Sequence, residues 1–135
     1  ELPYLLKFYK DGKLIGNYNG NVVESNIKAL YLRYGYLNNN KLNYAKIQPK
    51  EGCQDTIIEL ADELVYETLQ EEGNIEYKLL KSSEDDELTF VEKWESPEAL
   101  KKHMNSPHFL NFGEESGEFV KNMDIQVIDA KEIEF

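Results

Sequence analysis

The side chains best suited to chemistry in this sequence are one tryptophan and two histidines. Trp94, His103 and His108 are the only Trp and His residues among the 135 residues of the chain. An imidazole titrates near pH ~6.5, so either histidine could act as a general base toward a weakly acidic substrate. The indole N–H of Trp94 could hold a substrate oxygen. These residue types favour proton abstraction from a bound small molecule.

The pattern around these residues predicts a strand that ends at Trp94, followed by two short helices. Apolar side chains alternate along this strand and place Trp94 on its apolar face. A Ser-Pro pair opens each helix, at 96–97 and at 106–107. Serine caps a helix N-terminus, and proline is tolerated at the first helical position. The first helix then carries His103, and the second carries His108 near its start.

The rest of residues 41–135 shows period-2 strand patterns and one long amphipathic helix. We expect the helix over 55–70 and the strands over 42–48, 75–79, 88–94 and 125–130. The order βαββαβ is typical of the ferredoxin-like fold, which belongs to the α+β class. Helices cover one face of such a sheet, and the other face here also carries apolar residues. We therefore expect a homodimer in which a second copy covers that face.

Residues 1–40 are predicted to be a separate β-hairpin with a helix. Two aromatic strand patterns flank the Asp11-Gly12 turn signal, and a helical spacing follows over 24–34. This order resembles the C-terminal part of a thioredoxin fold. Cys53 is the single cysteine of the chain, so the Cys-x-x-Cys motif of redox thioredoxins is absent and no redox activity is expected. The predicted domains are thus 1–40 and 41–135.

Composition limits the partners and the compartment. The formal net charge of −11 makes nucleic acid and anionic membrane surfaces poor partners. A lone cysteine cannot form an intrachain disulfide, which favours a reducing compartment, and we expect a cytoplasmic protein. No transmembrane stretch or signal-peptide pattern is present in the sequence given. The chain begins with Glu1, so we expect it to be part of a longer product.

The motifs of residues 41–135 resemble the antibiotic biosynthesis monooxygenase family, in particular its small quinol-monooxygenase-like members. The motifs that carry this resemblance are Gly52, Glu71-Glu72-Gly73, Tyr77, Glu92-Lys93-Trp94-Glu95-Ser96, Ala99-Leu100, His103 and Ser106-Pro107-His108-Phe109. The resemblance implies a dimeric α+β barrel with a cavity between sheet and helices in each subunit. It also implies oxygenation of a phenolic or quinol substrate by O2 without metal or flavin. Such chemistry needs a base and a dry aromatic pocket.

The candidates for the catalytic residues of such a site are His103, as general base, and Trp94, as a cavity wall. The substrate-binding candidates are Tyr77, His108, Phe109, Asn43 and Tyr44. Alternation alone does not decide whether Asn43 or Tyr44 faces the cavity, since neighbours on a strand point to opposite faces. Each candidate also has a purely structural reading. Trp94 would then be a core aromatic residue, and His103 a hydrogen-bonded histidine that joins a helix to the sheet.

No metal or haem site is expected from the sequence. His103 and His108 are five residues apart across a helix break, and the pattern offers no fixed third ligand. Family members that degrade haem carry an Asn, a Trp and a His ligand at positions that correspond here to Ala45, His103 and Gly113. None of the three residues matches, so haem degradation is not expected.

Two functions of different classes remain. The first is a cofactor-independent monooxygenase that oxidises a quinol or related phenol with O2. The second is a non-catalytic module of the same fold for small-molecule binding or dimerisation. Isomerisation of a phosphorylated sugar is less favoured, because the acidic sequence lacks a cluster of basic residues. A cavity open to solvent with Trp94 and His103 on its wall would favour the enzyme, and a closed, packed cavity would favour the module.

Overall fold

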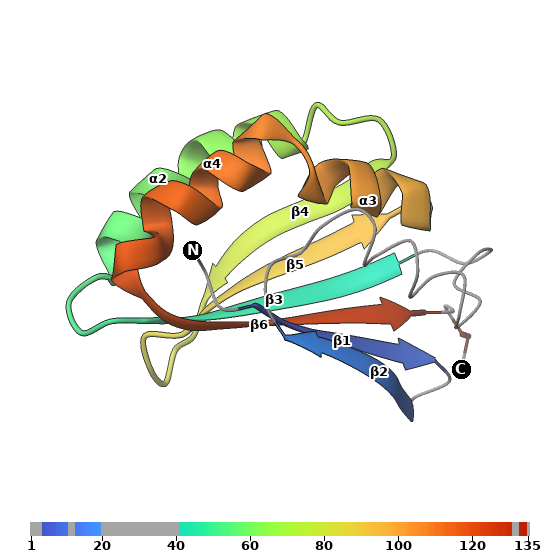
Figure 1. The fold of residues 1–135 in the computed structure, drawn as a ribbon, viewed down its shortest axis with the longest axis horizontal. Helices are drawn as coiled ribbons and strands as arrows, with labels where there is room; N and C mark the ends of the chain where they lie inside the picture. Colours follow the sequence, from blue (N-terminus) through green and yellow to red (C-terminus); the bar gives the residue numbers. More distant parts are fainter. Residues whose placement is uncertain (1–3, 11–12, 20–40, 131–132, 135) are drawn as a thin grey trace.

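The computed structural model describes residues 4–10, 13–19, 41–130 and 133–134. It shows one twisted β-sheet with its helices on one face (Figure 1). None of the helices in the described ranges is long and apolar enough to cross a membrane. The elements are β1 (Tyr4–Lys10), β2 (Lys13–Asn19), β3 (Lys41–Pro49), α2 (Gln54–Thr68), β4 (Asn74–Lys81), β5 (Leu88–Trp94), α3 (Pro97–Met104), α4 (Pro107–Ser116), the 3-10 turn η1 (Gly117–Phe119) and β6 (Val120–Asp129).

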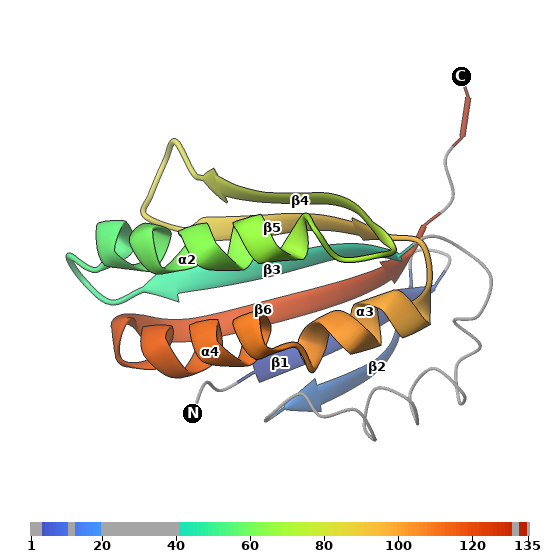
Figure 2. The same cartoon turned by 90° about the horizontal axis from the view of Figure 1, so that it is seen from above.

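The strand order confirms the predicted ferredoxin-like fold of the α+β class. The sheet runs β2-β1-β6-β3-β5-β4. Its last four strands pair antiparallel throughout, and with α2, α3 and α4 they form the βαββαβ unit. Seen from above, α2 lies beside α4, and α3 continues in line with α4 (Figure 2). The helices therefore enclose a core against one face of the sheet.

The hairpin predicted near the N-terminus is confirmed as β1 and β2, which pair antiparallel. Strand β1 also pairs in parallel with β6, so the hairpin extends the same sheet. An ion pair joins Lys7 Nζ on β1 to Asp124 Oδ2 on β6, at 3.2 Å. The helix predicted over 24–34 lies outside the described residues. The division into two domains and the thioredoxin resemblance stay predictions.

The core follows from alternation on the strands and from the apolar stripe of α2. Buried side chains come from every second position of β3, β5 and β6 and from one face of α2. Each large apolar side chain buried in this way stabilises the fold by about 1.5–3 kcal/mol. The largest fully buried side chains are Trp94, Phe90, Ile47, Ile57, Leu64, Leu88 and Leu100.

The predicted start of the last strand, at residue 125, is wrong. Strand β6 begins at Val120, five residues earlier than expected. The register with β3 shifts between Gln48 and Pro49, which leaves an extra residue on β6. Lys121 and Asn122 are consecutive exposed residues there, so apolar and polar positions do not alternate. A bulge of this kind hides a strand from a period-2 search.

Candidate functional site

His103 lies in a box of aromatic rings between α3 and the sheet. Its ring centroid is 4.7 Å from that of Trp94, 5.3 Å from that of Tyr77 and 5.2 Å from that of Phe109. Only 1% of its surface is exposed. Trp94 and Tyr77 come from β5 and β4, and Phe109 comes from the first turn of α4. Three elements thus exclude water from one imidazole.

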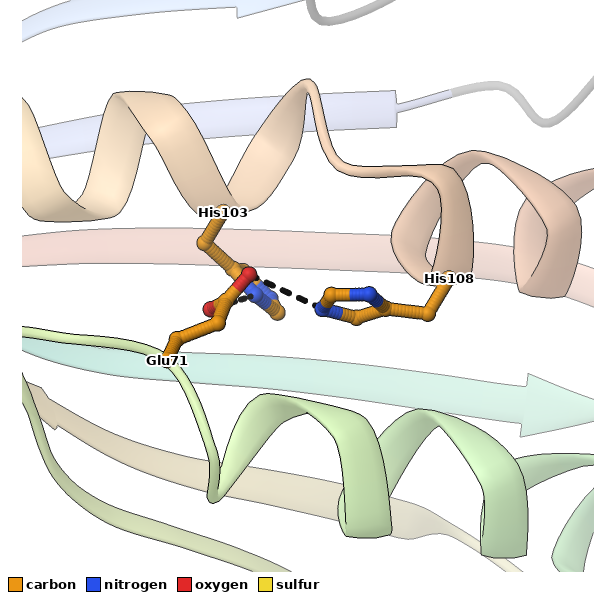
Figure 3. Close-up of side chains that lie close together, drawn as sticks. All are labelled: Glu71, His103 and His108. Carbon is orange, nitrogen blue, oxygen red and sulfur yellow. Dashed lines mark hydrogen bonds and ion pairs between the residues drawn. The ribbon is translucent and has the colours of Figure 1, made fainter.

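Glu71 joins both histidines through its two carboxylate oxygens (Figure 3). Glu71 Oε2 is 2.8 Å from His103 Nδ1, and Glu71 Oε1 is 2.8 Å from His108 Nε2. A carboxylate can only accept, so both rings donate an N–H to it. A neutral His103 then carries its proton on Nδ1, which leaves the Nε2 lone pair free. That buried Nε2 has no hydrogen-bond partner in the described part of the chain.

A tight loop places Glu71 against α3. Gly73 follows α2 with φ +90°, a conformation that favours glycine, and a Cβ there would lie 2.6 Å from the Cβ of Ala99. The Glu95 N–H donates to the Gly73 carbonyl at 2.9 Å, which fixes the loop to the end of β5. Close approach of this loop to α3 brings the Glu71 carboxylate within reach of His103.

Ser106 fixes the position of His108 relative to His103 through hydrogen bonds at the junction of α3 and α4. Its hydroxyl accepts the Phe109 N–H at 3.2 Å as the N-cap of α4, as the Ser-Pro pattern predicts. The same hydroxyl donates to the His103 carbonyl at 2.6 Å. The end of α3 and the start of α4 are therefore tied at one residue, and His108 reaches the second carboxylate oxygen of Glu71 beside His103.

A second buried carboxylate lies on β5. Glu92 accepts the Trp94 indole N–H at 2.9 Å and is 5% exposed. Burial raises the pKa of the Glu92 carboxyl above its usual value of 4.5, since desolvation disfavours the charged form. The neighbouring His103 and the Trp94 hydrogen bond act in the opposite direction and only partly offset burial. Glu92 therefore holds its proton more tightly than an exposed glutamate.

Asn43 lies directly across from Glu92 in the β3–β5 register. The Asn43 amide lies close enough to Glu92 to lower the pKa of that carboxyl slightly. Neither the Oδ1 nor the Nδ2 atom of Asn43, however, has the geometry of a hydrogen bond with another described residue. Asn43 is fully buried. Buried polar atoms without a partner are rare in native proteins and often mark a place for a water or a ligand. Asn43 and His103 Nε2 are two such groups beneath the same helices.

Two cavities lie close to these residues, one open and one closed. An open groove of about 660 Å³ runs over α3 and the start of α4 and is lined in part by Glu71 and His108. A closed cavity of about 10 Å³ lies deeper, with Tyr77, Glu92 and Phe109 among its lining residues. It has room for about one water. Trp94 and His103 line neither of these two cavities, whereas Tyr77 and Phe109 line the inner one.

The structure brings most of the predicted site residues together. Trp94, Tyr77 and Phe109 surround His103, His108 shares its Glu71 partner, and Asn43 lies beneath the same helices. Tyr44 is placed apart. It points to the opposite face of the sheet, where its register partners are Val91 and Gln126.

Glu71 and Glu92 were missed as site residues. The sequence could have identified Glu92 as buried, because it lies between Phe90 and Trp94 on the apolar face of its strand. An acid on that face is buried. Glu71 carried no comparable signal, since it follows the acidic face of α2 in the run Glu71-Glu72.

The structure also places a third potential metal ligand, Glu71, beside the two histidines, which the sequence pattern did not predict. Donor atoms of Glu71, His103 and His108 all lie within 4.8 Å of one another. Two imidazoles and a carboxylate could hold a divalent metal ion.

Comparisons with known proteins show the family to which this fold belongs. Residues 42–115 match the family described as antibiotic biosynthesis monooxygenase. The protein named "Putative monooxygenase Rv0793" from Mycobacterium tuberculosis is 32% identical over 76 residues, which are 56% of this chain and 75% of that protein. "Putative monooxygenase YcnE" from Bacillus subtilis is 33% identical over 70 residues, 51% of this chain and 72% of that protein.

Solved structures show the same similarity. The structure of Rv0793 aligns with a TM-score of 0.66 at 26% identity and covers 71% of this chain and 99% of that one. A conserved protein from Methanosarcina mazei aligns with a TM-score of 0.66 at 30% identity, over 71% of this chain and 95% of that one. From the match over 42–115 and the shared fold, this chain belongs to the antibiotic biosynthesis monooxygenase family.

Proposed function

We propose that this protein is a monooxygenase that oxidises a quinol or related phenol with O2, without a metal or flavin, and that His103 is its general base. The observation that carries the proposal is the state of the His103 ring. Its Nδ1 is held by Glu71 at 2.8 Å, and its buried Nε2 has no partner within the described ranges. Proton abstraction needs an imidazole whose Nδ1 is held by a hydrogen bond and whose Nε2 is free to accept a proton.

The chemistry divides into a proton transfer and an oxidation. His103 Nε2 takes a phenolic proton, and Glu71 stabilises the imidazolium that forms. The electron-rich phenolate then reduces O2, and the resulting radical pair combines at a ring carbon to give a peroxide. This peroxide loses water. One oxygen atom remains on the ring and the other leaves as water, so a quinol becomes a hydroxyquinone with no other reductant.

Asn43 and Trp94 have supporting roles in this proposal. The Asn43 amide donates to the phenolate oxygen, which satisfies a buried group that has no partner in the described residues. Trp94 packs against His103 and keeps water from the anion. Because the pocket is closed, the substrate must displace part of its wall. Residues 106–108 line the outer groove and Phe109 lines the inner cavity, so the first turn of α4 separates the two.

O2 consumption with a panel of hydroquinones tests the proposal. We expect uptake above spontaneous autoxidation that is unchanged by EDTA. His103→Ala should reduce turnover by at least about 100-fold, the usual scale of general-base catalysis. Trp94→Phe should reduce it less, and Glu59→Gln on the exposed face of α2 is the matched control. Uptake no greater than the spontaneous rate across the panel would reject the enzyme.

A non-catalytic binding or dimerisation module is the second candidate, and the closed cavity favours it. The sheet face without helices carries half-buried apolar side chains, among them Tyr44, Val91 and Ile128. We propose that a second copy packs there to form a homodimer. Light scattering would give the mass of the particle in solution. Thermal-shift screening with phenols would then detect ligands that bind but are not oxidised.

A further inference from the structure

We infer that Glu71, His103 and His108 also form a binding site for a divalent cation of the Zn²⁺ type, and that a bound cation stops His103 from acting as a base. The cation site stands on geometry alone. The loss of the base rests on the proposed function, so the two parts are tested by separate measurements.

The distances fit a metal ion. Each carboxylate oxygen of Glu71 is 2.8 Å from one imidazole nitrogen, and the donor atoms of all three residues lie within 4.8 Å. Two ligands of a tetrahedral Zn²⁺ ion, each ~2.0–2.1 Å from it, are ~3.3–3.4 Å apart. Two ligands of one ion are at most ~4.2 Å apart, so the three side chains must move slightly closer together when a cation replaces the two hydrogen-bonding protons.

The donor set is one that proteins use for first-row metals. Two imidazoles and one carboxylate bind Zn²⁺ and leave a position open for water. The three donors come from the loop after α2, the end of α3 and the start of α4 (Figure 3). Packing of three separate elements fixes the site, and no rearrangement of one flexible segment is needed to assemble it.

The groove provides entry from solvent. Glu71 and His108 both line it, and their side chains are 17% and 14% exposed. Glu72 and Glu98 add negative charge to the same groove, against the positive charges of Lys101 and Lys102. The first turn of α4 mildly disfavours a cation through the helix dipole, and the nearby carboxylates offset this effect. The local balance is therefore negative, which suits a divalent cation.

Metal binding and base catalysis exclude each other at His103. A neutral imidazole that gives its Nδ1 lone pair to a metal keeps its proton on Nε2. Nε2 can then no longer accept a proton from a phenol. When a cation occupies the site, His103 is held in the tautomer that carries its proton on Nε2, which cannot act as the base. When the site is empty, Nε2 is free to accept a proton. No redox change of the ion is involved.

Cobalt and zinc binding to the whole chain tests the site without any substrate. We expect one Co²⁺ per chain with the absorption bands of a nitrogen- and oxygen-ligated ion, displaced by Zn²⁺, and calorimetry with Zn²⁺ gives the affinity. Glu71→Gln and His108→Gln should each weaken Zn²⁺ at least about 10-fold. Glu72→Gln is the matched control, because it removes one charge from the same groove and no ligand.

Absence of binding would overturn the site. Equal affinity in Glu71→Gln, His108→Gln and the parent chain would also overturn it and would assign the metal to the acidic surface. Circular dichroism confirms that each variant is folded before it is compared. In a second arm, saturating Zn²⁺ should abolish quinol-dependent O2 uptake and EDTA should restore it. Uptake that persists under Zn²⁺ overturns the loss of the base. A parent chain that binds Co²⁺ through these residues but never consumes O2 supports the site and rejects the proposed function.

Discussion

Glu71 and His103 are 32 residues apart in the sequence, yet their side chains meet at 2.8 Å. The contact forms where the loop after α2 passes against α3, and it determines which nitrogen of a buried imidazole is free. His108 binds the other oxygen of the same carboxylate. The chemical identity of this site therefore depends on one acidic residue that belongs to a sequence motif of the family resemblance but was not predicted to be a site residue.

Glu71→Gln is expected to lower the quinol-dependent turnover number by at least about 10-fold, with a smaller effect on KM. Glutamine can accept with one atom only, so it cannot receive an N–H from both rings. His103 then loses either its orientation or its tautomer. O2 uptake measures the effect, and Glu72→Gln, one residue away and outside the hydrogen-bonded cluster, should leave turnover unchanged. Equal turnover in Glu71→Gln and the parent would show that His103 does not depend on this carboxylate.

Gly73→Ala is expected to destabilise the fold more than Gly52→Ala, by at least about 1 kcal/mol. Both glycines have positive φ, +90° and +76°, so both substitutions strain the backbone. At Gly73 the new methyl would also lie 2.6 Å from Ala99 Cβ, whereas nothing lies within 4 Å at Gly52. Urea unfolding gives the two free energies. If the two variants unfold at the same urea concentration, the loop is free to move away from α3.

The stability difference between the parent and Glu92→Gln should depend on pH. Burial raises the Glu92 pKa above 4.5, so the folded state holds this proton more tightly than the unfolded state. The resulting stabilisation is complete below the unfolded-state pKa and is lost as the pH rises through the raised folded-state pKa. Glu92→Gln, which has no such proton, should therefore gain stability relative to the parent as the pH rises.

Urea unfolding of the two proteins from about pH 4 to about pH 8 measures this change. Glu59→Gln, on the exposed face of α2, controls for the loss of one negative charge and should show a constant difference from the parent. A constant difference for Glu92→Gln as well would mean that Glu92 titrates like an exposed acid.

Ser106→Ala is expected to cost about 1–2 kcal/mol and to exceed the cost of Ser96→Ala. Both serines cap a helix, at 3.1 Å for Ser96 and 3.2 Å for Ser106. Ser106 also donates to the His103 carbonyl and is buried, so its removal leaves that acceptor with one fewer hydrogen bond. Thermal unfolding compares the two variants. A larger loss for Ser96→Ala would show that the tie between α3 and α4 contributes little.

The sequence by itself determined the order of strands and helices in residues 41–130. Period-2 and helical spacings are local, and each stretch carries its own signal, as in the apolar alternation of β5 and the Ser-Pro starts of α3 and α4. It also placed Trp94 on the apolar face of its strand. The sequence did not predict the early start of β6, because a bulge interrupts the alternation of apolar and polar residues there.

Only the tertiary structure decided which side chains meet. Alternation shows that Asn43 and Tyr44 point to opposite faces, but the packing of α2, α3 and α4 decides that Asn43 lies on the covered one. The Glu71–His103–His108 cluster depends on the close approach at Gly73 and on the hydrogen bonds of Ser106. The contacts of Glu71 with His103 and His108 join residues that are 32 and 37 positions apart along the chain, and local periodicity contains no information about such distances.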